Sequence, residues 1–366
     1  MSAVSASGLF TPEVRRYAEV AKGFTQFRVG DVLIAKITPC FENGKAAFIN
    51  RLPFPIGFGS TEFHVVRPSP AIHGPYLYRF VTTQQFRRKG AQRMTGSAGQ
   101  QRVPSEFLRQ LVIPLPPLEE QKRIAAILDN ADAIRRKREQ AIELADEFLR
   151  SLFLDMFGDP VTNPKGWPTY QLCELLSGIE SGWSPTCADR HAENSEWGVL
   201  KLGAVTSCVF KPEENKALLP GTSPRPKIEV RDGDVLFARK NTYELVAACA
   251  LAVDPPPRLM MSDLIFRLKI SEAQLVLPEY LWQALVQPSL RGRIQKLAGG
   301  SAGSMPNISK ERLLGAVLPV PPMDQQREFV LRLRKVQSIK NYIAEHHAEA
   351  QYASSALAAR AFSGGL

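Results

Sequence analysis

The chain has 366 residues, of which 44% are hydrophobic and 22% charged, and this balance excludes a disordered or collagen-like protein. The length is enough for two domains of roughly 100–200 residues each. Lysine and arginine number 46 against 36 aspartates and glutamates, and the resulting charge of +10 favours a polyanionic partner.

The cysteines and the apolar pattern indicate where the protein works. No C-x-x-C pair is present, which argues against a zinc knuckle or a disulfide framework and is typical of a reducing compartment. The first residues have no apolar core of signal-peptide length, and no stretch approaches the ~18 apolar residues of a membrane span. We therefore expect a cytoplasmic protein with no membrane partner, whose five cysteines are free: Cys40, Cys173, Cys187, Cys208 and Cys249.

The first predicted elements form a β-rich globular region. Asp31–Ile37 follows a Gly-Asp turn and Thr61–Arg67 is a second apolar run, so both ranges predict strands. A short helix is expected over Tyr76–Arg88, followed by a Gly/Ser loop. A strand bracketed by prolines then ends the region at Ile113–Pro117.

These prolines also fix the start of a long helix. A proline lacks the amide donor and pushes the preceding residue to extended geometry, so the helix begins near Leu118 or Glu119. From Ile127 the pattern alternates by four and three residues, which is the 3.5-residue period of a coiled-coil seam. The predicted pairing residues are Ile127, Ile134, Phe148 and Leu152.

The same order of elements then returns, shifted by 203 to 205 residues. Four matches in one order indicate a tandem duplication. Counted from Pro160, 73 positions precede Gly233, whereas only 29 residues precede the equivalent Gly30, so the first copy is 44 residues shorter at its start. The matching segments are Arg28–Lys36 with Arg231–Arg239, Pro75–Tyr78 with Pro278–Trp282, Gly96–Gln100 with Gly300–Ser304, and Ile113–Ile124 with Leu318–Phe329.

The second copy predicts strands at Asp234–Lys240 and Leu264–Ile270, a helix at Pro278–Lys296 and a second long helix. Its pairing residues are Phe329, Leu333, Val336, Ile343 and Leu357. The expected fold is α/β, in the sense of α+β, with globular domains at 1–117 and 158–322. Two long antiparallel helices, 118–157 and 323–362, follow these domains and pair as a coiled coil.

Basic residues surround the Gly/Ser loop in both copies. Phosphates are bound by lysine and arginine, and small residues let the backbone approach closely. The alternative is a solvated helix end followed by a flexible turn. The candidate DNA contacts are Arg87, Arg88, Lys89, Arg93 and Arg102 in the first copy, and Arg291, Arg293, Lys296, Ser301 and Ser304 in the second.

A second group of candidate contacts lies where a predicted strand ends. Arginine suits guanine and asparagine suits adenine, so polar residues at a strand end can read bases. An ordinary polar turn is the alternative. The candidates are Lys36 and Arg51 in the first copy, and Arg239, Lys240, Asn241 and Tyr243 in the second.

No catalytic or metal site is predicted. Asp254–Pro257 lacks the aromatic residue of a methyltransferase D-P-P-Y loop, and Glu120–Lys122 has nuclease-like E-x-K spacing but lies in the first turn of a predicted helix. The five histidines show no ligand spacing, and no P-loop is present.

The segment Ile113–Ile124, its echo Leu318–Phe329, and Ser151–Trp167 resemble the specificity subunit of type I restriction-modification systems. The resemblance covers nearly the whole chain in the family's order of recognition domain, helix, recognition domain, helix. The first recognition domain is shortened relative to the family pattern.

This resemblance implies that each recognition domain reads one half of a split double-stranded DNA target through the major groove. The helices would fix the unread spacer and dock modification (methyltransferase) subunits, and the complex would recruit restriction (translocase and nuclease) subunits. The subunit itself would have no catalytic residue and no cofactor, since S-adenosylmethionine, ATP and Mg belong to its partners. The alternatives are a methyltransferase or nuclease in its own right, and a coiled-coil adaptor that binds only proteins.

Overall fold

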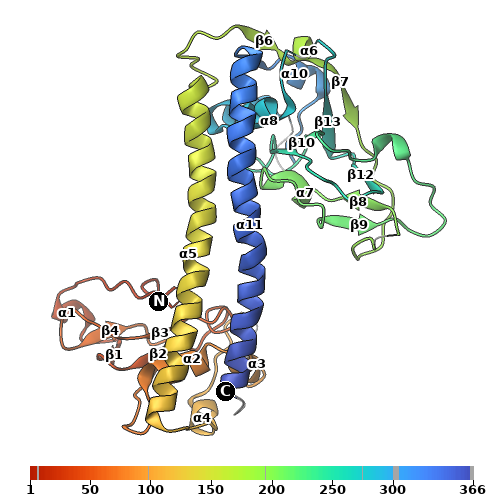
Figure 1. Cartoon of the computed structure of the whole chain (residues 1–366). Helices are drawn as coiled ribbons and strands as arrows, with labels where there is room; N and C mark the ends of the chain where they lie inside the picture. The colour runs from red at the N-terminus through yellow and green to blue at the C-terminus, as the bar shows by residue number, and fades with distance from the viewer. Residues whose placement is uncertain (6–7, 98, 194, 274, 300–304, 363–366) are drawn as a thin grey trace. The chain divides into compact units, whose positions relative to one another are not determined.

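The computed structural model describes residues 1–5, 8–97, 99–193, 195–273, 275–299 and 305–362. The chain divides into two compact units: unit 1 is Met1–Ile142 with Tyr342–Leu366, and unit 2 is Glu143–Asn341. Each long helix, α5 (Leu118–Phe157) and α11 (Met323–Ala361), therefore begins in one unit and ends in the other. The predicted mixed α/β fold with two long helices is confirmed (Figure 1).

Unit 1 is built on a three-stranded antiparallel sheet in the order β3-β2-β5. Strands β1 and β4 pair as a separate two-stranded sheet, and the short helices α2, α3 and α4 follow β5 in the chain. The elements are α1 (Tyr17–Val20), β1 (Thr25–Phe27), β2 (Val32–Ala35), β3 (Ala46–Phe48), β4 (Gly57–Gly59), β5 (Phe63–Val66), α2 (Gly74–Val81), α3 (Gln84–Ala91) and α4 (Ser105–Arg109).

Strand β2 is apolar throughout because both of its faces are covered. Val32 and Ile34 lie in one core with Leu77 of α2 and Phe86 of α3. Leu33 and Ala35 point to the other face and belong to a core with Val4, Phe27 and Phe63. All four strand residues are at most 2% exposed, which explains why the strand sequence is continuously apolar and does not alternate between apolar and polar residues.

Unit 2 repeats this arrangement in a larger form. The equivalent strands β11, β10 and β13 are joined by a fourth, β7, and β12, β8 and β9 form a further sheet. The elements are β6 (Thr169–Gln171), α6 (Leu172–Leu175), β7 (Leu176–Ser181), β8 (Gly198–Leu200), α7 (Gly203–Thr206), β9 (Asn215–Ala217), the 3-10 turn η1 (Pro226–Ile228), β10 (Val235–Ala238), β11 (Cys249–Leu251), β12 (Leu259–Met260), β13 (Ile265–Ile270), α8 (Pro278–Val286), α9 (Pro288–Gln295), α10 (Lys310–Leu314) and β14 (Val317–Pro319).

Two predicted helices are each divided in two. The range Tyr76–Arg88 contains the end of α2 and most of α3, because the Thr83 hydroxyl caps a new helix by accepting a hydrogen bond from the Phe86 amide at 3.3 Å. The range Pro278–Lys296 contains α8 and α9, because Pro288 has no amide hydrogen to continue α8 and instead begins α9.

The proline-bracketed strand forms in only one copy. In unit 2 it is β14, which pairs with β6. In unit 1 the range Ile113–Pro117 is not a strand, because no element equivalent to β6 pairs with it in the part of the chain that the structure describes.

The two long helices pack antiparallel in each unit. In unit 1, Ile124, Ala125 and Leu128 near the start of α5 share a core with Leu357 and Ala361 near the end of α11. In unit 2, aromatic rings of both helices meet, with Phe153 and Phe157 of α5 at 5.7 and 5.3 Å from Phe329 of α11. The stacking of Tyr280 from α8 on Phe153 at 5.6 Å ties this pairing to the globular part of unit 2.

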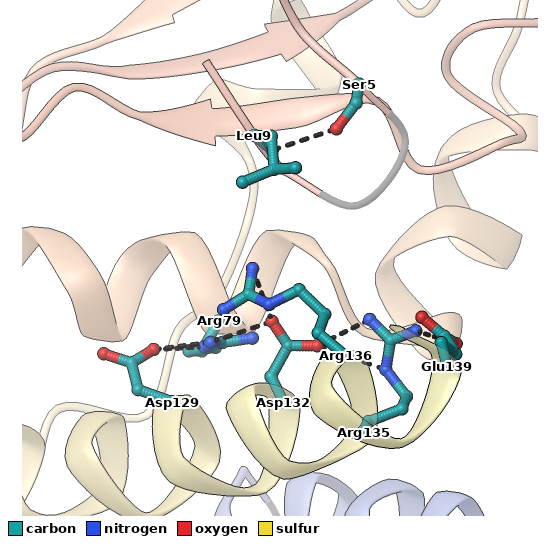
Figure 2. Close-up of polar contacts among 8 residues, drawn as sticks. All are labelled: Ser5, Leu9, Arg79, Asp129, Asp132, Arg135, Arg136 and Glu139. Carbon is teal, nitrogen blue, oxygen red and sulfur yellow. Dashed lines mark hydrogen bonds and ion pairs between the residues drawn. The ribbon is translucent and has the colours of Figure 1, made fainter. Parts of the chain in front are cut away.

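An ion-pair network attaches α2 to α5 in unit 1. Arg79 of α2 places a guanidinium nitrogen 2.6 Å from the Asp129 carboxylate and 3.4 Å from that of Asp132, and its side chain is only 13% exposed. Figure 2 shows Asp132 also paired with Arg135 and Arg136 of the next helical turn. The network fixes which face of α5 meets the globular part of the unit.

Candidate nucleic-acid interface

The two groups of candidate contacts predicted in each copy lie side by side, apart from Arg51 at the other end of β2 and from Ser301 and Ser304, which are outside the described residues. In unit 1 the end of β2 reaches the loop after α3, where Ile37 and Arg102 form a β-bridge and the Val103 amide donates to the Lys36 carbonyl at 2.8 Å. Unit 2 repeats this contact with a bridge between Lys240 and Asn307. We call this junction of strand end and loop the reading junction of each unit.

A tight turn sets the start of the strand that leads to each junction. Gly30 and Gly233 have φ angles of +92° and +82°, which a residue with a side chain adopts only under strain. The next residue, Asp31 or Asp234, accepts a hydrogen bond at 2.8 Å from the amide of Arg28 or Arg231. The repeated Arg-x-Gly-Asp motif is therefore a turn that aims the strand at its junction.

The candidate residues at the unit 1 junction differ in how free they are. Arg102 binds the Glu62 carboxylate through two nitrogens at 2.9 to 3.2 Å, and this hydrogen bonding lowers the pKa of Glu62 below its ordinary value. Lys36 is half-buried, whereas Arg93 is exposed and makes no ion pair among the described residues. Arg51 is also exposed, but it follows β3 where Ile49 bonds to Gly30 and Asp31, so it lies near the start of β2 and not at the junction. The charge of Arg102 is thus already balanced, and that of Arg93 is available.

The strand end of unit 2 is more enclosed than the sequence suggests. The Arg239 guanidinium lies 5.2 Å from the centre of the Phe266 ring, and Asn241 is only 5% exposed. The Asn241 side-chain oxygen accepts from the Thr242 amide at 2.8 Å, which closes the turn. Lys240 is half-buried, and Tyr243 is 54% exposed. Tyr243 is therefore the most accessible candidate of this group.

Arg87 and Arg291 occupy equivalent places and brace a loop. Arg291 donates to the Glu244 carbonyl at 2.9 Å, and Arg87 donates to the Glu42 carbonyl at 3.5 Å. The Nε atom of each arginine is buried without a hydrogen-bond partner in the described structure. Their side chains therefore support the loop after the reading strand, a role that the count of basic residues did not indicate.

The remaining basic candidates of α3 and α9 are exposed. They form no ion pair among the described residues, so their charges can meet a phosphate backbone. Ser301 and Ser304, predicted as contacts in the second copy, lie outside the described residues. The exposed cations are Arg88 and Lys89 in unit 1, and Arg293 and Lys296 in unit 2.

A groove of about 720 Å³ runs along α3 in unit 1. Its wall carries the cations of α2 and α3 together with glutamine amides, and the apolar side chains of Leu128 and Phe362 form part of its lining. Because Arg79 is neutralised by the network of Figure 2, the unpaired positive charge in this groove comes from Arg87, Arg88 and Lys89.

Most of the predicted helix-pairing residues lie in the packed part of the helices. Phe329 and Leu333 are 0% exposed, Leu152 is 8% exposed, and Val336, Ile343, Leu357 and Ile127 are partly buried. Ile134 and Phe148 differ, since they expose 49% and 54% of their surface. Leu149 is buried in place of Phe148, because the inward face of α5 has turned by one residue relative to a strict 3.5-residue period.

One buried glutamine holds the start of each long helix, and neither of them was identified in the sequence analysis. Gln121 accepts from the His73 amide at 2.9 Å and donates to the carbonyls of Ala71 and Pro116. Gln326 makes the same three contacts in unit 2, with Leu277, Leu275 and Pro321. Their signal was present as a glutamine at the same place in both repeated proline segments.

The described residues contain no group of histidine, cysteine and acidic side chains arranged to hold a metal ion. Among those same residues, no helix is both long enough and apolar enough to cross a bilayer. Disulfides do not contribute to the fold, since all five cysteines are free.

Comparisons with known proteins agree on one family. Residues 8–144 match the model of the type I restriction modification DNA specificity domain. The type I restriction enzyme EcoEI specificity subunit of Escherichia coli is 29% identical over 88% of this chain and 70% of its own length. Both matches are to the specificity subunits of type I restriction-modification systems, and together they cover most of the chain.

Solved structures agree on the fold of this specificity subunit. The type I system S subunit from M. genitalium has a TM-score of 0.57 at 13% identity, covering 93% of this chain and 84% of that chain. A chain from a structure of an assembled type I R-M system has a TM-score of 0.56 at 21% identity, covering 100% of this chain and 90% of that one. Specificity subunits are the non-catalytic components of their systems, and they carry no cofactor.

Proposed function

We propose that this specificity subunit reads a bipartite DNA target, one half with the reading junction of each unit. The observation that supports the proposal is the repetition of the junction, in which a strand end and a loop are joined by the same bridge in both copies. Exposed cations stand next to the loop in each unit, where they can position the duplex through its phosphates.

The test separates phosphate contact from loop support in unit 2. The double variant Arg293→Ala/Lys296→Ala should weaken binding to all DNA sequences and reduce the slope of log K against log salt by about 0.9 for each phosphate that is no longer neutralised. The matched control is Lys335→Ala, which removes an exposed cation of α11. An unchanged slope in the double variant would contradict a phosphate-binding role.

Arg291 is expected to behave differently from Arg293. Because Arg291 holds the Glu244 carbonyl, Arg291→Ala should increase hydrogen exchange in the loop that contains Glu244 as well as weaken DNA binding. Arg293→Ala should leave exchange in that loop unchanged. Equal exchange in the two variants would remove the bracing role.

Base reading at the strand end of unit 2 is assigned to Tyr243 and Asn241. Asn241 can contact a base only if its turn opens, since its side chain is buried in the free protein. Asn241→Ala should relax preference at one base position with nearly intact non-specific affinity. Selection from random DNA checks this, and recovery of an unaltered motif would remove Asn241 from the reading surface.

The same subunit assembles with modification and restriction subunits, as members of this family do. We assign the contact with a modification subunit to the apolar residues that the helix pairing leaves exposed in unit 2. Leu144 and Phe148 lie one turn apart on α5 with 62% and 54% of their surface exposed, and Leu331 and Ile339 of α11 are 63% and 58% exposed. Large apolar side chains exposed on both helices are typical of a protein interface.

Introducing negative charges on this apolar surface tests the assignment. Leu144→Asp/Phe148→Asp should reduce co-purification with the modification subunit, because the charges would have to be buried in the interface. The control Val253→Asp alters an equally exposed valine in a loop. Undiminished assembly of the double variant would place the interface elsewhere.

One test and one observation separate DNA recognition from the alternatives. The free chain should show no affinity for S-adenosylmethionine, whereas a methyltransferase in its own right would bind it tightly. A coiled-coil adaptor would not need the repeated junction with its exposed cations. The five free cysteines support a location in a reducing cytoplasm.

A further inference from the structure

One edge in unit 2 is completed by a segment that unit 1 lacks among its described residues. Strand β14 pairs with β6 in antiparallel register, Val317 opposite Gln171. The pairing is extended at both ends, since the Leu172 amide donates to the Ala316 carbonyl and the Val320 amide donates to the Pro168 carbonyl, each at 2.8 Å. The backbone groups of this edge are thereby satisfied.

The equivalent edge of unit 1 is open. The Leu111 carbonyl and the Leu115 amide, which correspond to the paired groups of Ala316 and Val320, have no hydrogen-bond partner in the described structure. Val112 is 87% exposed and Leu115 is 57% exposed, whereas Val320 at the place of Leu115 is 6% exposed. An extended segment with free backbone groups and exposed apolar side chains is a template for another strand.

Apolar packing next to this edge is also incomplete. In unit 2 the helical turn α6 follows β6 and buries Leu172 and Leu175, each 1% exposed, in the core that contains Leu313 of α10. Leu108 of α4, at the place of Leu313, remains partly exposed in unit 1. Next to the open edge, Leu108 is therefore available for packing against apolar side chains of an added segment.

We propose that the edge Leu111–Leu115 of unit 1 is an acceptor site for an extended segment of a second polypeptide, with the chemistry of Pro168–Leu175. Such a segment supplies a short strand for main-chain pairing and then a helical turn with two inward leucines. Unit 2 shows both features in place on the same framework, which identifies the occupant as a peptide segment. The site is separate from the DNA-reading junctions.

The experiment uses the full chain and a fluorescent peptide of residues 165–181 of this sequence. Fluorescence anisotropy should show saturable binding of this peptide and none of a scrambled peptide. Val112→Lys, which puts a charge on the edge, should weaken binding by about tenfold or more. Leu115→Pro removes the free amide at a residue that already precedes a proline, and it should weaken binding similarly while the chain stays folded.

The control is Val29→Lys, because Val29 is a half-exposed valine of unit 1 that lies on the turn before β2. It should bind the peptide as the unaltered chain does. Amides of residues 111–115 should become protected from hydrogen exchange when the peptide is added. Absence of saturable binding up to millimolar peptide, or binding that neither edge variant weakens, would overturn the proposal without bearing on DNA recognition.

Discussion

The two units share a framework of hydrogen bonds but differ in how that framework is completed. The Tyr76 hydroxyl donates to the Pro114 carbonyl at 2.9 Å, and the Tyr280 hydroxyl donates to the Pro319 carbonyl at 2.7 Å. In unit 2 a strand and a helical turn then cover this segment, whereas in unit 1 it stays exposed. These two equivalent hydrogen bonds thus form whether or not the covering layer is present.

The repeated aspartates show a second difference between the units. Burial acts to raise the pKa of Asp31, but hydrogen bonds from Arg67 and the Arg28 amide outweigh it, so the pKa is lowered. Burial dominates at Asp234 and raises its pKa, although the Arg231 amide and Arg267 oppose it. Arg267 is a poorer partner because its Nε, 2.9 Å from the Asp234 carboxylate, lacks hydrogen-bond geometry.

The largest expected difference concerns aromatic packing of the long helices. Phe153→Ala in unit 2 should cost about 3–5 kcal/mol, because Phe153 is fully buried against three aromatic rings. Phe362→Ala in unit 1 should cost about 1–2 kcal/mol, because Phe362 is partly exposed. Hydrogen exchange, measured separately for the amides of each unit, gives both losses of stability. Equal losses would mean that aromatic packing stabilises the two units equally.

The glutamines that hold the helix starts should give equal effects in the two units. Gln121→Ala and Gln326→Ala each remove three hydrogen bonds at a buried site and should each cost about 1–3 kcal/mol. Exchange protection in the first turns of α5 and α11 is the measurement. A cost confined to one unit would show that the equivalent hydrogen bonds do not contribute equally to the stability of the two units.

The aspartates should give effects of opposite pH dependence. Asp31 has a lowered folded pKa, so its contribution is present above the unfolded pKa of about 3.9 and is lost as the pH falls through the folded value. The cost of Asp31→Asn, about 1 kcal/mol at pH 7, should therefore shrink toward pH 3. Asp234 has a raised pKa, so the cost of Asp234→Asn should grow as the pH falls.

Exchange protection of β2 and β10 between pH 7 and about pH 3 distinguishes these two trends, after correction for intrinsic exchange rates. The matched variants differ only in the unit that carries the change. Parallel trends would contradict the assignment of a good arginine partner to Asp31 and a poor one to Asp234.

The smallest effects are expected from ion pairs between the globular parts and the long helices. Arg79→Gln should cost about 1 kcal/mol, because Arg79 is largely buried between two carboxylates. Arg334→Gln should change stability by less than about 0.5 kcal/mol, because Arg334 is 69% exposed beside Glu279. Thermal or denaturant shifts in the two variants measure the difference, and a larger effect at Arg334 would reverse the comparison.

Sequence patterns predicted the features that depend on local chemistry. The Gly-Asp turns, the strands after them and the start of α5 at Leu118 follow from glycine conformations, apolar runs and the missing amides of prolines. The fold class and the DNA-specificity function are confirmed. The site residues remain predictions, since no comparison tests individual contacts.

Features that depend on long-range packing could not be predicted in the same way. The meeting of Lys36 and Arg102 at one junction joins residues 66 positions apart, and no periodicity encodes it. The bracing by Arg291 and the exposure of Phe148 depend on which neighbours fill the space around them. Because Arg102 and Arg79 are already paired with carboxylates, a count of basic residues also overestimates the positive charge available to DNA.

The division of the chain has a consequence for biosynthesis. Unit 2 is one continuous stretch, Glu143–Asn341, so all of its parts are synthesised before the last helix is complete. Unit 1 begins at the N-terminus, yet Tyr76, Ile124 and Leu128 share a core with Leu357 and Ala361. The part of unit 1 that precedes unit 2 is therefore synthesised before unit 2 but completes its core after it, and this apolar surface stays uncovered until the end of α11 has been synthesised.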